Sequence, residues 1–204
     1  MRTNVLLVVA VFGVVACQSK SNEAASTDAQ APAAAEKSMA PAPGTPEAKI
    51  ASAASAGPES ISANATIVEW SGNPADKQTV LREGTNDWTC YVDFPSTSDA
   101  DPICADKTVG EWFEAFLQKQ PPKLKTVGLA YMLQGDAGVS ETDPWAQAAT
   151  PDNQWHKTGP HTMVFVPDPK QLDGFSSDHT SGGPYVMWKG TPFAHIMMPV
   201  APPK

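Results

Sequence analysis

The stretch Thr162-Met163-Val164-Phe165-Val166 decides the fold, because it places apolar side chains on both alternating faces. Residues 127–133 and 193–198 share this pattern. A half-exposed strand alternates apolar with polar residues, whereas a strand covered on both faces does not. We therefore expect the three stretches to form central strands of a sheet that is covered on both sides.

Shorter strands are expected around this centre. Residues 66–70 and 185–188 are rich in β-branched and aromatic side chains. The second of these is expected to pair with 193–198 through a turn at 189–192. Residues 79–83 and 88–92 flank the turn-forming sequence Gly84-Thr85-Asn86-Asp87, which predicts a hairpin between them.

The clearest helix is predicted over residues 107–119. Its large apolar residues follow the i, i+3, i+4, i+7, i+8 spacing of one helical face: Val109, Trp112, Phe113, Phe116 and Leu117. Asp106 is a suitable N-cap for this helix. We interpret the aromatic stripe as core packing rather than as a ligand site. The expected fold class is α+β, with a mostly antiparallel sheet and one prominent amphipathic helix.

The N-terminus has the layout of an export signal. Arg2 precedes an apolar run of twelve residues from Val5 to Ala16. As a helix this run would be about 18 Å long, whereas the hydrocarbon core of a bilayer is roughly 30 Å thick. A membrane-spanning helix is therefore the weaker interpretation.

The run ends in Val14-Val15-Ala16-Cys17, which resembles the lipobox of bacterial lipoproteins. The resemblance implies that residues 1–16 are removed as a signal peptide and that Cys17 receives a diacylglycerol and a further acyl chain such as palmitate. An ordinary secretory signal with a chance cysteine is the alternative. Gln18 and Ser19 follow the cysteine where an aspartate would favour the inner membrane. The resemblance therefore favours anchoring in the outer membrane of the cell envelope.

Residues 17–60 comprise the cysteine to be lipidated and a segment rich in Ala, Pro and Ser, without aromatic residues. The segment has too few large apolar side chains for their burial to offset the conformational entropy lost on folding. We therefore expect a disordered tether. An Ala-rich helix near residues 31–42 is the alternative, but Pro32 and Pro41 interrupt it. The single globular domain is expected at residues 61–204, which hold all six Trp.

Charge and cysteine content restrict the partners and the compartment. The 14 basic and 22 acidic residues give a net charge of −8, which argues against a nucleic-acid partner, since phosphates require a basic face. The same charge argues against binding to anionic lipid, so we expect membrane contact through the lipid anchor only. Cys90 and Cys104 form an even pair in an exported domain, which predicts a disulfide rather than a metal-binding thiol pair.

The pattern His-x-Met occurs twice, at residues 161–163 and 195–197. On a strand, residues i and i+2 point to the same face. If the two strands are neighbours, His161, Met163, His195 and Met197 would meet as a soft ligand set that suits copper(I). Core packing is the competing interpretation, because Met fills gaps in protein cores. No other cofactor is indicated.

The sequence Asp178-His179-Thr180-Ser181-Gly182-Gly183-Pro184 brings an acid, a base and a hydroxyl close together before a Gly-Gly turn. Loops on rigid scaffolds often carry function. The candidate ligand-binding residues are His179, Ser181, Gly182, Gly183 and Trp188. A hydrolase using His179 and Ser181 is an alternative, although the chain has no Gly-x-Ser-x-Gly nucleophile elbow. A plain surface loop is the third interpretation.

Residues 134–138, Gln-Gly-Asp-Ala-Gly, form a second loop of this kind, without the Lys-Ser/Thr of a phosphate-binding loop. Several further motifs are similar to those of a family of uncharacterised exported bacterial proteins. They lie at residues 86–90, around Cys104, and at residues 131–135, 159–161, 166–169, 182–192 and 195–197. The resemblance extends over residues 88–200, which is most of the expected domain, and favours an exported single domain. It implies no catalytic residue.

These observations together predict a lipid-anchored lipoprotein of the cell envelope. Its tethered domain is expected to bind an envelope protein or a small ligand of unknown specificity, in the periplasm. Because no catalytic set is recognisable, a binding protein is favoured over an enzyme. A copper-binding protein and an envelope hydrolase are the alternatives.

Overall fold

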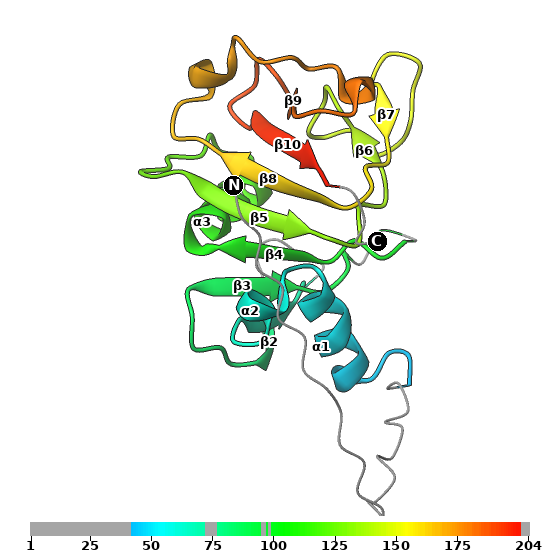
Figure 1. The fold of residues 1–204 in the computed structure, drawn as a ribbon, viewed down its shortest axis with the longest axis vertical. Helices are drawn as coiled ribbons and strands as arrows, with labels where there is room; N and C mark the ends of the chain where they lie inside the picture. The colour runs from blue at the N-terminus through cyan, green and yellow to red at the C-terminus, as the bar shows by residue number, and fades with distance from the viewer. Residues whose placement is uncertain (1–41, 72–76, 95–96, 98, 201–204) are drawn as a thin grey trace, which may run out of the picture. The chain divides into compact units, whose positions relative to one another are not determined.

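The computed structural model describes residues 42–71, 77–94, 97 and 99–200, and these form one body (Figure 1). The expected signal peptide, Cys17 and residues 18–41 of the expected tether lie outside the described residues. No helix within these ranges has the length and apolar character of a membrane span. The elements are α1 (Pro46–Ser55), α2 (Glu59–Ser62), β1 (Thr66–Glu69), β2 (Thr79–Arg82), β3 (Trp88–Tyr91), β4 (Ile103–Asp106), α3 (Lys107–Leu117), β5 (Gly128–Met132), β6 (Val139–Ser140), β7 (Trp155–His156), β8 (His161–Phe165), η1 (Pro169–Leu172), η2 (His179–Ser181), β9 (Tyr185–Met187) and β10 (His195–Pro199).

An eight-stranded sheet in the order β2-β1-β3-β4-β5-β8-β10-β9 carries the fold. Its neighbouring strands are antiparallel except for β1 and β3, which are parallel. Strands β6 and β7 form a separate antiparallel pair, which we call the β6–β7 hairpin. The prediction of an α+β fold with a mostly antiparallel sheet is confirmed.

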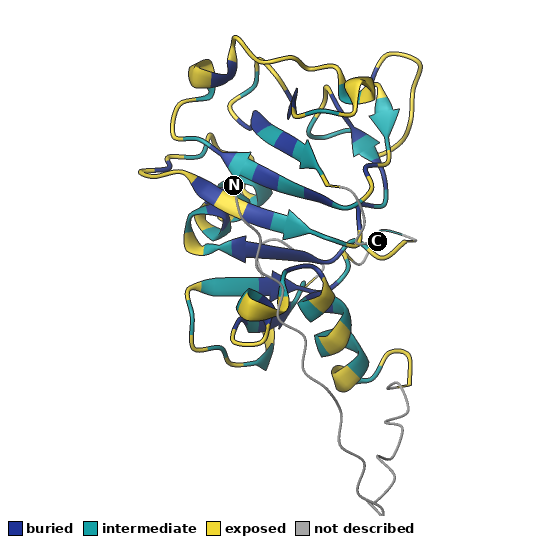
Figure 2. Cartoon of the chain, viewed as in Figure 1, coloured by how far each residue is buried: buried dark blue, intermediate teal, exposed yellow. Residues whose placement is uncertain are grey.

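The three stretches predicted as central strands are β5, β8 and β10, and they are adjacent in the sheet. Their inner-face residues Ala130, Met163 and Met197 are buried in the main core. On the outer face, Leu129 is 41% exposed and Val164 is half-buried. The expected cover on both sides is therefore wrong for the middle of the sheet (Figure 2). On this face α1 and α2 pack over the β3–β4 end and η1 over the β9–β10 end, which leaves the middle open.

The predicted hairpin between residues 79–83 and 88–92 is wrong, because β1 lies between β2 and β3 and pairs with both. The connection passes around the start of β1: the backbone N–H groups of Thr85 and Asn86 donate to the carbonyl of Asn64. A Cβ on Gly84 would lie 2.2 Å from the backbone nitrogen of Thr66. Glycine is therefore required where the two chain segments cross.

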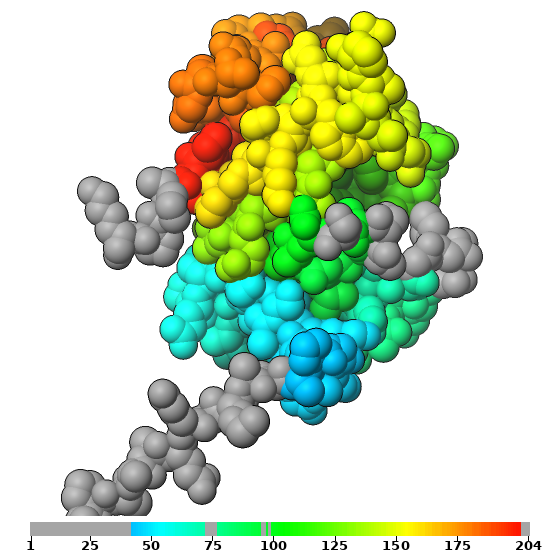
Figure 3. Space-filling model, turned by 90° about the vertical axis from the view of Figure 1, so that its right-hand side faces the viewer, coloured from blue at the N-terminus to red at the C-terminus, as the bar shows by residue number. Residues whose placement is uncertain are grey.

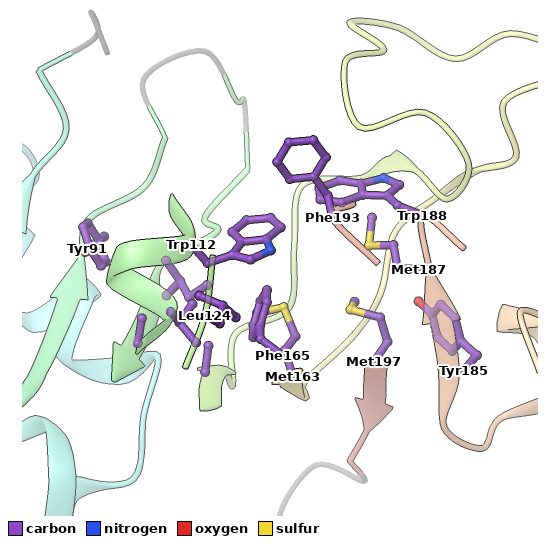
Figure 4. Close-up of a cluster of buried hydrophobic side chains, with 14 of the residues drawn as sticks. Tyr91, Trp112, Leu124, Met163, Phe165, Tyr185, Met187, Trp188, Phe193 and Met197 are labelled. Carbon is purple, nitrogen blue, oxygen red and sulfur yellow. The ribbon is translucent and has the colours of Figure 1, made fainter. Parts of the chain in front are cut away.

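Helix α3 covers the inner face of β3, β4 and β5. It begins as predicted, with the Asp106 carboxylate accepting a hydrogen bond from Val109 N at 2.9 Å, and ends two residues earlier than expected. Val109 and Trp112 are buried, whereas Glu111 and Glu114 are exposed. The Trp112 ring makes edge contacts with Phe165 and Phe193 at centroid distances of 4.9 and 5.8 Å (Figure 4).

Helix α1 shows that the predicted domain boundary at residue 60 is wrong. Thr45 caps the helix by accepting from Ala48 N, and Ala53 and Ala56 are fully buried against the sheet. The prediction relied on large apolar side chains, but here small residues allow a helix to approach the sheet closely. The expected tether therefore ends before this helix.

The predicted disulfide between Cys90 and Cys104 is confirmed. The two cysteines are directly opposite each other on β3 and β4, and both are fully buried. The end of α1 covers them: the Cys104 Sγ atom lies 3.6 Å from the carbonyl oxygen of Ala53. A Cβ on Gly57 would lie 3.0 Å from Cys104 Sγ, so this approach has no room for a larger residue.

Candidate functional site

A group of polar side chains lies where the β6–β7 hairpin meets β9. We call it the Glu141 cluster, and its members are Asp136, Glu141, His156, Thr158, His179 and Tyr185. The Tyr185 hydroxyl is at its centre, donating to Glu141 Oε1 at 3.1 Å and lying 3.1 Å from Thr158 Oγ1. Figure 3 shows the segment around β7 (yellow) at the surface, next to the segment around η2 (orange).

The Glu141 carboxyl is the most unusual group of the cluster. The residue is 5% exposed, and within the described part of the chain its Oε2 atom has no hydrogen-bond partner. Burial raises the pKa of Glu141 to about 7, and the charge of Asp136 acts in the same direction, whereas the hydrogen bond from Tyr185 opposes the shift. This carboxyl therefore changes between its neutral and charged forms near neutral pH. Burial also raises the pKa of the Tyr185 hydroxyl.

Asp136 positions Thr158 beside Tyr185. Its Oδ1 atom accepts hydrogen bonds from Gly138 N at 2.9 Å and Thr158 N at 3.0 Å. The turn before it places Gly135 at φ +84°, a left-handed conformation that glycine adopts without strain. The buried carboxylate thus ties the loop after β5 to the segment that leads into β8.

Two histidines extend the cluster toward the surface. The rings of His156 and His179 lie 4.5 Å apart, and the His179 ring is 6.2 Å from that of Tyr185. Both histidines are half-buried, and the Nδ1 atom of His179 has no partner among the described residues. Burial lowers the pKa of His156, and the neighbouring His179 lowers it further. The cluster therefore runs from partly exposed imidazoles to a buried carboxyl.

The predicted ligand loop contributes only part of this site. His179 belongs to the cluster, whereas Ser181, Gly182 and Gly183 form a local turn outside it. In this turn Ser181 Oγ accepts from Gly183 N at 3.3 Å, and Gly182 has φ +74°. The Asp178 carboxylate accepts from the backbone and hydroxyl of Thr180. These contacts do not form the acid–base–nucleophile relay that a hydrolase requires.

Trp188, the remaining residue of that prediction, fixes the hairpin to the sheet. Its backbone N–H donates to the Glu141 carbonyl at 2.9 Å, and its Nε1–H donates to the Ser140 carbonyl at 2.7 Å. The indole is parallel to that of Trp112, with ring centroids 6.1 Å apart. Trp188 has φ +54°, which is costly for a bulky residue and is found where surrounding contacts enforce it. The backbone of Glu141 is thereby held in place.

The four residues predicted as a soft-metal set all point to the inner face of the sheet. Met163 and Met197 are directly opposite each other on β8 and β10, and Figure 4 shows their thioethers side by side. His161 is opposite Pro199, four residues from His195 along β10. The two imidazoles thus belong to positions about 13 Å apart along the strand direction. The structure brings the two methionines together but does not bring the two histidines to one point.

Both of these histidines have the same internal hydrogen bond. The Nδ1 atom of His161 lies 2.7 Å from the Gly159 carbonyl, and that of His195 lies 3.0 Å from the Phe193 carbonyl. Burial lowers the pKa of both, that of His195 to about 4, so both rings are neutral at neutral pH. A neutral ring that donates through Nδ1 keeps its Nε2 lone pair free to accept.

A groove of about 830 Å³ lies elsewhere, between α3 and strands β1–β3. Val68, Tyr91 and Phe113 are among its apolar residues, and Glu111 and Glu114 are among its charged residues. It shares no residue with the Glu141 cluster and contains no histidine. We therefore base the candidate site on the cluster, whose groups have perturbed pKa values and unpaired atoms.

Much of the cluster was not predicted from the sequence. Asp136 lies in the Gln-Gly-Asp-Ala-Gly loop that the sequence indicated, and His179 in the predicted ligand loop. Glu141, His156 and Tyr185 were not predicted as site residues, because each is an isolated polar residue in a strand or turn. No family model, no curated protein and no solved structure matches the chain. The resemblance to exported bacterial proteins therefore stays a prediction.

Proposed function

We propose that the chain is a lipid-anchored protein of the cell envelope whose domain binds a small ligand in the Glu141 cluster. The lipobox ending at Cys17 supports the anchor. The Cys90–Cys104 disulfide supports an oxidising compartment such as the periplasm. The observation that carries the ligand proposal is the buried Glu141 Oε2 atom next to Tyr185, which has no hydrogen-bond partner among the residues that the structure describes.

Buried polar atoms in folded proteins are almost always hydrogen-bonded, so an unpaired carboxyl oxygen favours a partner supplied from outside the chain. Such a partner would donate to Glu141 Oε2 and meet the hydroxyls of Tyr185 and Thr158. An amide group has both the donor and the acceptor for this arrangement. We therefore propose a small ligand with an amide group, which enters past the half-buried His156 and His179.

The anchor is tested by metabolic labelling with palmitate followed by membrane fractionation. The wild-type chain should be labelled and should sediment with the outer membrane. Cys17→Ser should lose the label and leave the membrane fraction, because one thiol carries the acyl chains. An unlabelled wild-type chain, or a labelled Cys17→Ser variant, would overturn the anchor proposal.

The ligand site is tested by NMR titration with N-methylacetamide as the probe. We expect saturable shifts at Glu141, Thr158 and Tyr185, with a dissociation constant in the millimolar range that is usual for so small a molecule. Glu141→Leu should abolish these shifts, whereas Glu111→Leu, at an exposed position of α3, should leave them unchanged. Shifts that do not saturate, or that persist in Glu141→Leu, would refute the amide site.

A further inference from the structure

His161 has methionine positions on two sides of it on the inner face of the sheet, and Pro199 is its direct neighbour on β10. It is directly opposite Met132 on β5, and Met163 follows two residues later on its own strand. Met197 is opposite Met163 and hence diagonal to His161. Side chains on one face lie about 5 Å apart when directly opposite, about 7 Å apart along a strand and about 7–8 Å apart on the diagonal, distances that a long, flexible methionine side chain spans. All three thioethers are therefore within reach of one point next to the imidazole.

The burial and hydrogen bonding of His161 are those of a histidine that binds a metal ion through Nε2. The side chain is fully buried, and its Nδ1 donates to the Gly159 carbonyl at 2.7 Å. The Nε2 atom has no partner among the described residues. Histidines that bind metals through Nε2 usually have this second hydrogen bond, which fixes the tautomer and orients the ring. A buried lone pair without a donor is otherwise rare in a native core.

The ligand chemistry is selective. One neutral imidazole and three thioethers form a soft, uncharged set that suits a monovalent ion such as Cu(I), and not Mg²⁺ or Ca²⁺, which need oxygen ligands. Within the described ranges, no group of three or more His, Cys, Asp and Glu residues could hold a metal ion. The buried carboxylate of Asp136 interacts electrostatically with His161 and would offset the positive charge of a bound ion.

His195, the second buried histidine of the inner face, has different surroundings from His161. It has the same Nδ1 hydrogen bond, but its ring stacks on Phe165 at 4.7 Å and contacts Trp112 and Trp188 at 5.7 and 5.2 Å. Its lateral neighbour on β9 is Met187. Aromatic rings therefore surround His195, whereas the positions next to His161 on β5 and on its own strand are methionines.

We propose that Met132, His161, Met163 and Met197 form a binding site for a single Cu(I) ion, with His161 Nε2 as its nitrogen ligand. The site differs from the set expected from the sequence, because Met132 takes the place of His195. It goes beyond the amide site of the Glu141 cluster and does not depend on it. Met132, which is half-buried, is the most accessible of the four ligands.

The test is an anaerobic Cu(I) titration of the full chain against a chromophoric chelator. The chain carries Cys17→Ser, which removes the one cysteine outside the disulfide and therefore a competing soft ligand. We expect uptake of one equivalent. Met132→Leu and His161→Gln should each weaken binding by about tenfold or more, whereas the matched controls Met187→Leu and His195→Gln should bind as the parent does.

A second measurement does not depend on any variant folding. Ag(I), a redox-inert probe of the same softness, is titrated while the methionine methyl signals are followed by NMR. The methyls of Met132, Met163 and Met197 should shift together at one equivalent, and those of Met187 and Met198 should not. No uptake, equal affinity in His161→Gln, or shifts centred on Met187 would each overturn the proposal. Because Glu141→Leu should retain Cu(I) uptake, failure of one site is distinguishable from failure of the other.

Discussion

Replacing Glu141 by Gln tests whether the buried carboxyl is neutral or charged near neutral pH. Gln has the same shape and can still accept the hydrogen bond from Tyr185, but it carries no charge at any pH. The charged and titratable groups that interact with this carboxyl are the Tyr185 hydroxyl on β9 and the carboxylate of Asp136 in the loop before β6. The substitution therefore removes one titration and preserves the contacts around it.

Proton linkage determines whether Glu141 makes the folded protein more or less stable as the pH rises. The pKa of Glu141 is raised from 4.5 to about 7, so the folded protein binds a proton that the unfolded chain has already released between these values. The contribution to stability is therefore complete below pH 4.5 and is lost as the pH rises to about 7. At about 1.4 kcal/mol per pKa unit the full shift corresponds to about 3 kcal/mol. Because relaxation and water penetration around a buried charged carboxylate reduce this penalty, we expect a loss of about 1–2 kcal/mol.

Urea unfolding of both proteins at a series of pH values from 4.5 to 8.5 provides the measurement. We compare the free energy of unfolding of the variant with that of the wild type at each pH, because histidines also make this free energy depend on pH. Histidines with lowered pKa values, such as His195, make the folded protein less stable as the pH falls, which is the opposite direction. Glu141→Gln should match the wild type at pH 4.5 and exceed it by about 1–2 kcal/mol at pH 8. Glu111→Gln, at an exposed position, should give a flat difference. A flat difference for Glu141→Gln, or a variant less stable than wild type at pH 8, would refute the reasoning.

Three further predictions concern the fold, and all are measured as free energies of unfolding in urea. Trp112→Ala should cost about 3–5 kcal/mol, because the indole is buried at the centre of the aromatic core. Replacing both Cys90 and Cys104 by Ala should cost about 2–4 kcal/mol, and a cost below 1 kcal/mol would contradict a stabilising disulfide. A chain of residues 61–204 should be about 2 kcal/mol less stable than one of residues 42–204, because it lacks the alanines that α1 buries; equal stability would restore the boundary predicted from the sequence.

The sequence predicted those parts of the fold that depend on large apolar side chains in a regular spacing. Helix α3 has such a spacing, and β5, β8 and β10 were predicted as strands from their apolar runs, whereas the sequence left open which of these strands are neighbours. Helix α1 was not predicted, because its buried residues are alanines, which resemble those of a disordered segment. The insertion of β1 between β2 and β3 was not predictable from local turn chemistry, since the contact of Gly84 with Thr66 joins residues 18 positions apart.

The residues of the candidate sites also fall into those that the sequence predicted and those that it did not. His161, Met163 and Met197 were recognised because a strand places residues i and i+2 on one face. The contribution of Met132 depends on the register of β5 against β8, which the sequence does not specify. Glu141 becomes a candidate only through its burial and its contact with Tyr185, 44 positions later in the chain. Isolated polar residues of this kind have no pattern in the sequence, and their significance comes from the tertiary structure alone.

The buried polar atoms without a hydrogen-bond partner are confined to one part of the described chain. In the described part of the chain the buried side-chain atoms without a partner are Glu141 Oε2, His161 Nε2 and His179 Nδ1. None is on α1, α2 or α3, or on strands β1–β5. A purely structural core would gain stability by replacing such groups with apolar residues, since each unpaired atom costs about 1–3 kcal/mol. That all three lie in the segment from β6 to η2 supports the proposals that place the ligand and metal sites there, while the helices and the disulfide at the other end contribute the stability that offsets the cost.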